Sequence, residues 1–179
     1  MEYLVVGLGN PGRTYAQTRH NVGFLSVEKF VERQGFSFRL AAQFSGKIAM
    51  GKVVEKSIYA LLPLTYMNKS GEAVGLVARY FHIPTHHLLV VCDDINIPFG
   101  SLRIRSEGSA GGHNGLKSIE THLGTRDYAR LRIGVGDRTH GDLADHVLGD
   151  FTEKEREEIP QIIENAAASI EQWLKLTGE

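Results

Sequence analysis

The 179-residue sequence has one cysteine and no apolar run of 18 residues. A lone cysteine, Cys92, cannot form an intramolecular disulfide, which suits a reducing compartment and leads us to expect a cytoplasmic protein. The short apolar runs predict no membrane-spanning helix, and residues 1–20 lack the charged start and apolar core of a signal peptide. A chain of this length buries roughly 70% of its unfolded surface, so its core needs no stabilising metal or disulfide. Membrane, secreted, coiled-coil and disordered classes are therefore excluded.

The chain also lacks a net charge excess, with 20 basic and 21 acidic residues. The two signs are unevenly distributed. Residues 1–138 hold 17 Lys and Arg against 11 Asp and Glu, whereas residues 139–179 hold 3 against 10. Because local field rather than total charge steers an anionic partner, the basic part is compatible with nucleic-acid binding. We expect the acidic end, about 152–179, to be a solvated helical tail.

Apolar, β-branched segments alternate with amphipathic ones along the chain. Strands are predicted at 3–8, 44–54, 57–62, 88–92, 101–106 and 131–135. Helices are predicted at 21–34, from 68 or 70 to just before Pro84, from about 116, near 142–148 and at 155–175. This alternation indicates a single α/β domain over residues 1–179, a three-layer sandwich with helices on both faces of a twisted sheet. The adjacent strands at 44–62 make that sheet mixed.

Several motifs resemble cofactor or nucleophile sites but lack required residues. Gly7-x-Gly9-x-x-Gly12 follows a predicted strand like a dinucleotide fingerprint, but Pro11 removes a backbone N–H and no acidic residue ends a second strand. The hypothesis of a nucleotide-dependent oxidoreductase depends on that match alone. There is no serine-hydrolase elbow, His-Glu-x-x-His or cysteine pair, and Cys92 is typical of a small buried apolar residue. We therefore expect no cofactor and no metal.

Polar residues recur where a predicted strand has just ended or a predicted helix is about to begin. In open α/β sheets the ends of several strands meet at one crevice, so residues far apart in the chain can converge there. The candidates are Asn10, His20, Asn21, Asn68, Asp93, His113 and Asn114.

A histidine paired with a carboxylate among amides suggests activation of a water molecule. The carboxylate fixes the imidazole tautomer and makes its other nitrogen a better base, and an amide can hold water, a carbonyl or an oxyanion. With no Ser or Cys nucleophile, these residues favour a hydrolase without a covalent intermediate. The alternatives are turns and helix caps for Asn10, Asn21 and Asn68, and a cap or surface ion pair for Asp93.

Six short motifs follow one another at consistent spacing: Val6-Gly-Leu-Gly-Asn-Pro-Gly12, Tyr15-x-x-Thr-Arg-His-Asn-x-Gly23, Pro63-x-Thr-Tyr-Met-Asn-x-Ser-Gly71, Asp93-Asp-x-x-x-Pro-x-Gly100, Gly111-Gly-His-Asn-Gly-Leu-Lys117 and Arg130-Leu-Arg-Ile-Gly-Val-Gly136. Together they closely resemble the bacterial peptidyl-tRNA hydrolase family. The resemblance runs from residue 1 to about 151, and the tail resembles the family only as a helical segment.

The resemblance implies a metal-independent hydrolase that cleaves the ester between a peptide's C-terminal carbonyl and the 3′ ribose of tRNA, so recycling tRNA from stalled translation. His20 would be the general base, Asp93 would stabilise its basic form, and Asn10 would discriminate peptidyl from free aminoacyl esters. The residues implied to bind the substrate are Tyr15, Tyr66, Met67, Asn68, His113 and Asn114. Of these, His113 would be supporting structure, since its neighbour Asn114 carries the polar contact.

Arginines at a spacing of two on predicted strands indicate phosphate binding, since guanidinium forks match phosphate oxygens. Arg103 and Arg105 form one such pair, and Arg130 and Arg132 form another. The resemblance implies that Arg105 and Arg132 clamp a tRNA 5′ phosphate, in a monomer that binds the acceptor stem and 3′ end. Surface solubility is the alternative for all four.

The loop after residue 136 departs from the family, whose members usually carry lysine there. Arg138 or His140 would have to substitute, and the nearby Asp142 and Asp145 would weaken the grip on tRNA. The alternative function is a non-catalytic RNA-binding adaptor that uses the same groove. Such an adaptor has no use for a histidine paired with an aspartate.

Overall fold

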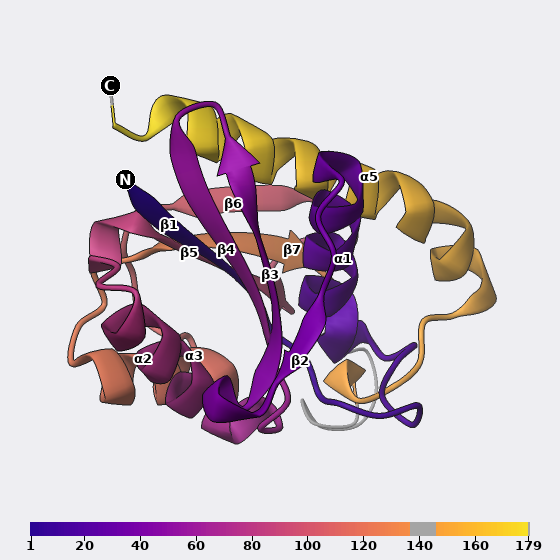
Figure 1. Ribbon diagram of the computed structural model, residues 1–179. Helices are drawn as coiled ribbons and strands as arrows, with labels where there is room; N and C mark the ends of the chain where they lie inside the picture. Colours follow the sequence, from indigo (N-terminus) through magenta and orange to yellow (C-terminus); the bar gives the residue numbers. More distant parts are fainter. Residues whose placement is uncertain (137–145, 179) are drawn as a thin grey trace.

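The structure, a computed structural model, describes residues 1–136 and 146–178 (Figure 1). The strands are β1 (Glu2–Gly7), β2 (Arg39–Ala41), β3 (Gly46–Val53), β4 (Lys56–Pro63), β5 (Leu88–Asp94), β6 (Leu102–Arg105) and β7 (Ala129–Gly134). The helices are α1 (Val22–Gln34), α2 (Ser70–Tyr80), α3 (Asn114–Leu123) and α5 (Glu153–Leu176), with short 3-10 turns η1 (Arg19–Asn21), η2 (Ala42–Phe44), η3 (Met67–Lys69) and η4 (Thr85–His87).

The strands form one mixed sheet in the order β2-β3-β4-β1-β5-β7-β6. The four central strands, β4, β1, β5 and β7, are parallel. β2 and β3 extend one edge and β6 the other, each antiparallel to its neighbour. The single α/β domain with a mixed sheet that the sequence predicted is therefore confirmed.

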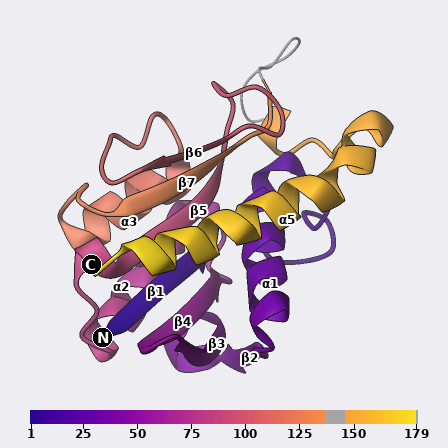
Figure 2. The same cartoon turned by 90° about the horizontal axis from the view of Figure 1, so that it is seen from above.

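The central strands are buried on both faces because helices cover both. Tyr3 and Val5 of β1 pack into the core beneath α1 and α5, whereas Leu4 and Val6 pack into the core beneath α2 and α3. This alternation follows from the two-residue period of a strand. Figure 1 shows α2 and α3 side by side and away from α1 and α5, and Figure 2 shows α5 running along the sheet over α1.

The connections that leave the parallel strands diverge at their carboxyl ends. The chain passes from β1 into α1 on one face of the sheet, whereas β4 leads to α2, and β5 leads through β6 to α3, on the other face. A crevice forms where successive connections diverge in this way, and ligands of open α/β sheets bind there. A ligand-binding site is therefore expected at the carboxyl ends of β1 and β5.

The acidic tail differs from its prediction, because α5 is part of the core. Its apolar face is buried against the sheet and α1, through Ile162, Ala166, Ala167, Ile170, Trp173 and Leu174. On its polar side, Glu164 and Glu171 bind Arg33 of α1 at 3.0 and 2.9 Å. The tail is thus an integral helix of the domain, and only its outer side is solvated.

The other predicted elements are found with small shifts. β2 was not predicted, since three residues carry too little pattern, and α3 begins at Asn114 rather than near residue 116. The helix expected near 142–148 lies largely outside the described residues. Among the helices that the structure describes, none has the length and apolar character needed to cross a membrane.

Candidate active site

A cavity of about 570 Å³ lies at the carboxyl ends of β1 and β5. Nine of the predicted site residues line it: Asn10, His20, Tyr66, Met67, Asn68, Asp93, His113, Asn114 and Arg132. Tyr15 and Arg105 are not among its lining residues. Chain segments that are more than 120 residues apart thus contribute to one cavity, as the strand-end argument predicts.

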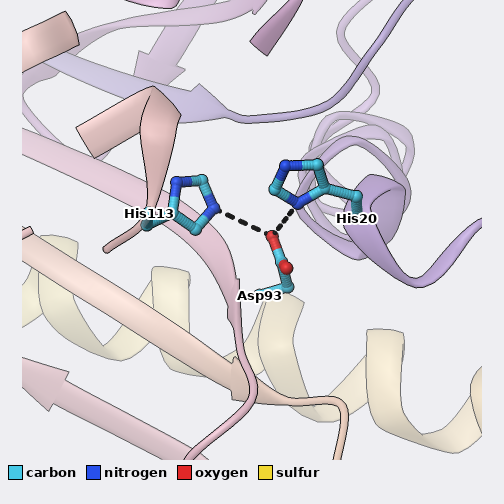
Figure 3. Close-up of side chains that lie close together, drawn as sticks. All are labelled: His20, Asp93 and His113. Atoms are coloured by element: carbon cyan, nitrogen blue, oxygen red, sulfur yellow. Dashed lines mark hydrogen bonds and ion pairs between the residues drawn. The ribbon is translucent and has the colours of Figure 1, made fainter. Parts of the chain in front are cut away.

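His20 and Asp93 are neighbours in this cavity (Figure 3). His20 lies in η1, just before α1, and Asp93 lies at the end of β5. The His20 Nδ1 atom is 2.7 Å from Asp93 Oδ1, and the two side chains are only 10% and 2% exposed. The pair leaves the other ring nitrogen of His20, Nε2, for a ligand in the cavity. Asp93 is therefore neither a helix cap nor part of a surface ion pair.

Glycines bring η1 and α1 close enough to β5 for this contact. A Cβ at Gly23 would lie 2.4 Å from the carbonyl oxygen of Val91 and 2.7 Å from that of Leu8. A Cβ at Gly7 would lie 2.6 Å from the carbonyl oxygen of Gly23. Gly7 at the end of β1 and Gly23 in the first turn of α1 thus allow α1 to pack closely on the sheet.

His113 makes a second contact with the same carboxylate oxygen (Figure 3). Its Nε2 atom lies 2.9 Å from Asp93 Oδ1. Its Nδ1 atom accepts hydrogen bonds from the backbone nitrogens of Gly115 and Leu116, so His113 is the N-cap of α3. Both of its ring nitrogens are therefore bound within the protein.

The two imidazoles set the charge state of Asp93. Burial alone would raise the pKa of this carboxyl, but His20 and His113 outweigh it and hold the pKa well below the usual range of an aspartate. The carboxylate is thus ionised at neutral pH. A buried negative charge with two N–H donors is a stable arrangement.

One nitrogen from each histidine and one oxygen of Asp93 lie within 4.8 Å of one another, a spacing that a metal ion could bridge. A metal on His113 Nε2 would require the proton of a neutral ring to sit on Nδ1. That proton would point at the backbone N–H groups of the α3 N-terminus. The donor set therefore fits a hydrogen-bonded triad better than a metal, and the absence of a metal remains a prediction.

Asn10 is fixed by its hydrogen bonds. Its backbone nitrogen donates to Asn21 Oδ1 at 2.8 Å, and Asn21 Nδ2 donates to the Asn10 carbonyl oxygen at 2.9 Å. Its side-chain Oδ1 accepts from the backbone nitrogen of Met67 at 2.7 Å, so its Nδ2 is the atom left to donate into the cavity. The side chain of Asn21 does not cap α1, and instead it holds the Asn10 turn.

The segment from Tyr66 to Asn68 forms one wall of the cavity. Tyr66 has a positive φ of 62°, and its exposed ring packs edge-on against Tyr15 at a centroid distance of 6.3 Å. Met67 is buried, whereas Asn68 is exposed to the cavity from η3. Asn114 is exposed to it from the first turn of α3. Tyr15 thus supports Tyr66 from outside the cavity.

The expectation that Arg130 and Arg132 form a phosphate-binding pair is wrong for Arg130. Its side chain is fully buried against the ring of Tyr128 and donates to the carbonyl oxygens of residues 109, 126 and 128. Arg132 lines the cavity, where it donates to Ser109 and to Asp94 Oδ2, the latter at 3.4 Å. Directly opposite Arg132 on β6 lies the exposed Arg103, and Arg105 is the diagonal neighbour.

The predicted substitutes for the family lysine, Arg138 and His140, lie outside the described residues. No sequence pattern predicted the apolar part of the cavity wall, which consists of Ile95, Val147 and Leu148. Cys92 is fully buried, and burial raises the pKa of its thiol to about 12. Its thiol therefore does not serve as a nucleophile at neutral pH.

Comparisons with known proteins agree with this geometry. A family model described as peptidyl-tRNA hydrolase matches residues 4–178, so the match includes the tail, beyond the range that the motifs covered. A peptidyl-tRNA hydrolase from Gloeobacter violaceus is 46% identical over 94% of this chain and 85% of its own length. A peptidyl-tRNA hydrolase from Bacillus cereus is 44% identical over 96% of this chain and 92% of its own.

A solved structure shows the same fold. The crystal structure of peptidyl-tRNA hydrolase from Acinetobacter baumannii superposes with a TM-score of 0.91 and 34% identity, covering 97% of this chain and 88% of that one. A TM-score this high over nearly the full length means that the layers and the strand order are shared. The residues of the cavity, the family model and the relatives therefore lead to one conclusion: the chain belongs to the peptidyl-tRNA hydrolase family.

Proposed function

We propose that this protein hydrolyses peptidyl-tRNA by attack of a water molecule that His20 activates. The observation that carries the proposal is the buried contact of 2.7 Å between His20 Nδ1 and Asp93 Oδ1 inside a cavity lined by four asparagines. An ionised carboxylate can only accept, so the ring proton of His20 lies on Nδ1. Its Nε2 therefore carries a lone pair and serves as the base.

The reaction proceeds in two steps with balanced protons. The water oxygen attacks the ester carbonyl carbon while His20 Nε2 takes one of its protons, and a tetrahedral oxyanion forms. The bond between that carbon and the 3′ oxygen of the ribose then breaks, and His20 returns the proton to the leaving oxygen. The products are a tRNA with a free 3′ hydroxyl and a peptide carboxylic acid, which keeps the second proton of the water and then loses it to solvent to become a carboxylate. A positioned general base contributes about 10²–10⁴-fold to such a step.

The asparagines orient the reactants without adding charge. Asn10 Nδ2 donates a hydrogen bond to the peptide. A free aminoacyl ester carries only the first residue and lacks the rest of the peptide. Asn68 and Asn114 lie on different segments of the wall and hold the substrate, the water and the oxyanion. One oxyanion donor contributes about 10²–10³-fold in kcat.

The tRNA lies over the β6–β7 edge with its 3′ end entering the cavity past Tyr66. Arg103 and Arg105 on β6 and Arg132 on β7 bind phosphates of the acceptor stem, because all three are within reach of solvent on adjoining strands. We further propose that the protein acts as a monomer in the cytoplasm. A non-catalytic RNA-binding adaptor is less favoured, because it leaves the buried His20–Asp93 pair without a use.

The decisive experiment is incubation of the purified protein with N-acetylated aminoacyl-tRNA in the presence of EDTA. We expect release of the acetylated amino acid and little cleavage of the same aminoacyl-tRNA with a free amino group. Binding of the tRNA without ester cleavage would favour the adaptor instead.

A further inference from the structure

His113 connects the start of α3 to the carboxylate of Asp93. Its Nδ1 atom lies 3.1 Å from the backbone nitrogen of Gly115 and 3.4 Å from that of Leu116. Its backbone is extended, with φ −75° and ψ 116°, as an N-cap residue requires. Gly115 allows close packing at this point, since a Cβ there would lie 2.6 Å from Met67 Sδ, 2.8 Å from Leu8 Cδ1 and 3.1 Å from His113 Cε1.

These contacts determine where the proton of the ring lies. A nitrogen that accepts from a backbone N–H must keep its lone pair, so Nδ1 of His113 carries no proton. The proton of the neutral ring therefore lies on Nε2, which is 2.9 Å from Asp93 Oδ1. Since that oxygen only accepts, His20 donates to it through Nδ1 and His113 through Nε2. The two histidines thus carry opposite tautomers.

The two rings also differ in what surrounds the nitrogen that does not face Asp93. A proton added to His113 Nδ1 would break both capping bonds and face two backbone N–H groups at the positive end of a helix. A proton added to His20 Nε2 enters the cavity and leaves the bond from Nδ1 to Asp93 intact. The arrangement of the helix start therefore distinguishes two histidines that share one carboxylate.

We propose that His113 is a positioning residue for the hydrolysis proposed above: as the N-cap of α3 it is held neutral, and its Nε2–H fixes Asp93 so that His20 alone acts as the base. The inference rests on the proposed function for its effect on rate. Its structural part, the pair of opposite tautomers, can be measured without any substrate.

Other charged or titratable groups surround the three side chains and must stay constant in a test. They are Tyr66, Asp94 and Arg132 on the cavity wall, Cys92 behind Asp93 on β5, Arg19 beside His20 and bound to Glu155, Lys69 of η3 and Lys117 of α3. A substitution at His113 leaves all of these side chains in place.

The first test is nitrogen NMR of the wild-type protein labelled with ¹⁵N-histidine at neutral pH. We expect the signals of His113 to show a proton on Nε2 and a bare Nδ1, and those of His20 to show the reverse. His122, whose Nδ1 donates to the Ser118 carbonyl, provides an internal reference for the second pattern. A His113 ring that is doubly protonated, or protonated on Nδ1, would overturn the proposal even if the enzyme is active.

The second test separates capping from positioning with His113→Asn. Asparagine is a strong N-cap, so α3 and the melting temperature are retained, but its amide is too short to replace the Nε2–H donated to Asp93. We expect kcat to fall about tenfold with KM nearly unchanged, since one hydrogen bond to a charged group is lost. The acidic limb of the pH–rate profile should move to higher pH, because Asp93 then stabilises the protonated base more strongly.

His122→Asn is the matched control, since it makes the same change on the same helix away from the cavity. It should leave kcat and the pH profile as they are. Wild-type kcat and an unshifted profile in His113→Asn would reduce His113 to a cap and overturn the proposal. If the wild-type protein does not cleave peptidyl-tRNA, the proposed function fails, and the NMR result still decides the tautomers.

Discussion

Asp93 is a buried carboxylate whose single oxygen Oδ1 receives both imidazoles, at 2.7 and 2.9 Å. Such a group is stable only as long as its donors remain, because an unpaired buried charge is costly. Asn10 shows the same dependence at a neutral group, since its carbonyl, backbone nitrogen and side-chain oxygen are all bound by Asn21 and Met67. The polar residues of the cavity thus hold one another in place before any substrate binds.

Asp93→Asn should change how the stability of the protein depends on pH. The folded-state pKa of Asp93 lies below its unfolded value. Its charge therefore stabilises the fold above about pH 4, and this contribution is lost as the pH falls through the folded-state value. Melting temperatures of wild type and Asp93→Asn should differ by a constant amount above about pH 5 and converge only as the pH falls well below 4. A gap that stays constant at low pH as well would show that the carboxylate charge contributes nothing to the fold.

Asn21 and Arg130 show why the sequence predicted only part of the site. Asn before a helix and Arg on a strand end have common roles as cap and phosphate ligand, and those roles were the natural predictions. In the structure Asn21 holds the Asn10 turn and Arg130 is buried on Tyr128. Both outcomes depend on side chains brought close by the fold, which local sequence pattern does not encode.

Elements are positioned around the site by close approach of their backbones. The start of α1 touches the ends of β1 and β5, where Gly23 leaves no room for a Cβ. Arg19 in η1 links the same region to the start of α5 by a hydrogen bond to Glu155 at 2.9 Å. It also donates to the carbonyl oxygen of His146, which precedes α5, at 3.1 Å. The predicted helix and strands around these points were found because their apolar periodicity is strong. How closely the backbones of these elements approach one another was not predictable from that periodicity.

Gly23→Ala should therefore affect both stability and catalysis. The new methyl group would lie 2.4 Å from the Val91 carbonyl oxygen, and backbone atoms on both sides prevent easy relaxation. We expect a loss of about 3 kcal/mol in unfolding free energy and reduced kcat, because η1 moves away from Asp93. Gly75→Ala on α2 is the control, since its Cβ would meet only the flexible end of Arg79, and it should be neutral or stabilising. Urea unfolding measures both, and equal stabilities would contradict the packing argument.

The molecule as a whole separates its charges between the two faces of the sheet. Arg103 on β6 lies opposite Arg132 on β7, and Arg132 lies opposite Cys92 on β5 in the strand register. These arginines therefore point to the face of the sheet that carries α2 and α3. The acidic α5 lies on the other face, where Glu164 and Glu171 are bound by Arg33. A near-neutral protein can thus present a basic edge to an anionic partner.

This separation predicts a salt dependence of substrate binding that is specific to one edge. KM for peptidyl-tRNA should rise with salt, and Arg105→Gln on β6 should lower the slope of log KM against log salt by about one, the effect of one lost phosphate contact. Arg39→Gln is the matched control, because Arg39 is also exposed but lies on β2 at the opposite edge of the sheet. Equal slopes for the two variants would place the tRNA elsewhere.

The central claim is that the imidazole of residue 20, held by the carboxylate of residue 93, removes a proton from the attacking water. The most direct measurement is kcat of His20→Ala on a blocked aminoacyl-tRNA, together with its affinity for the uncleaved substrate. We expect a loss of at least about 10³-fold in kcat with affinity within about threefold of wild type, because the arginines proposed to bind phosphate are untouched. Turnover close to that of the wild type would contradict it.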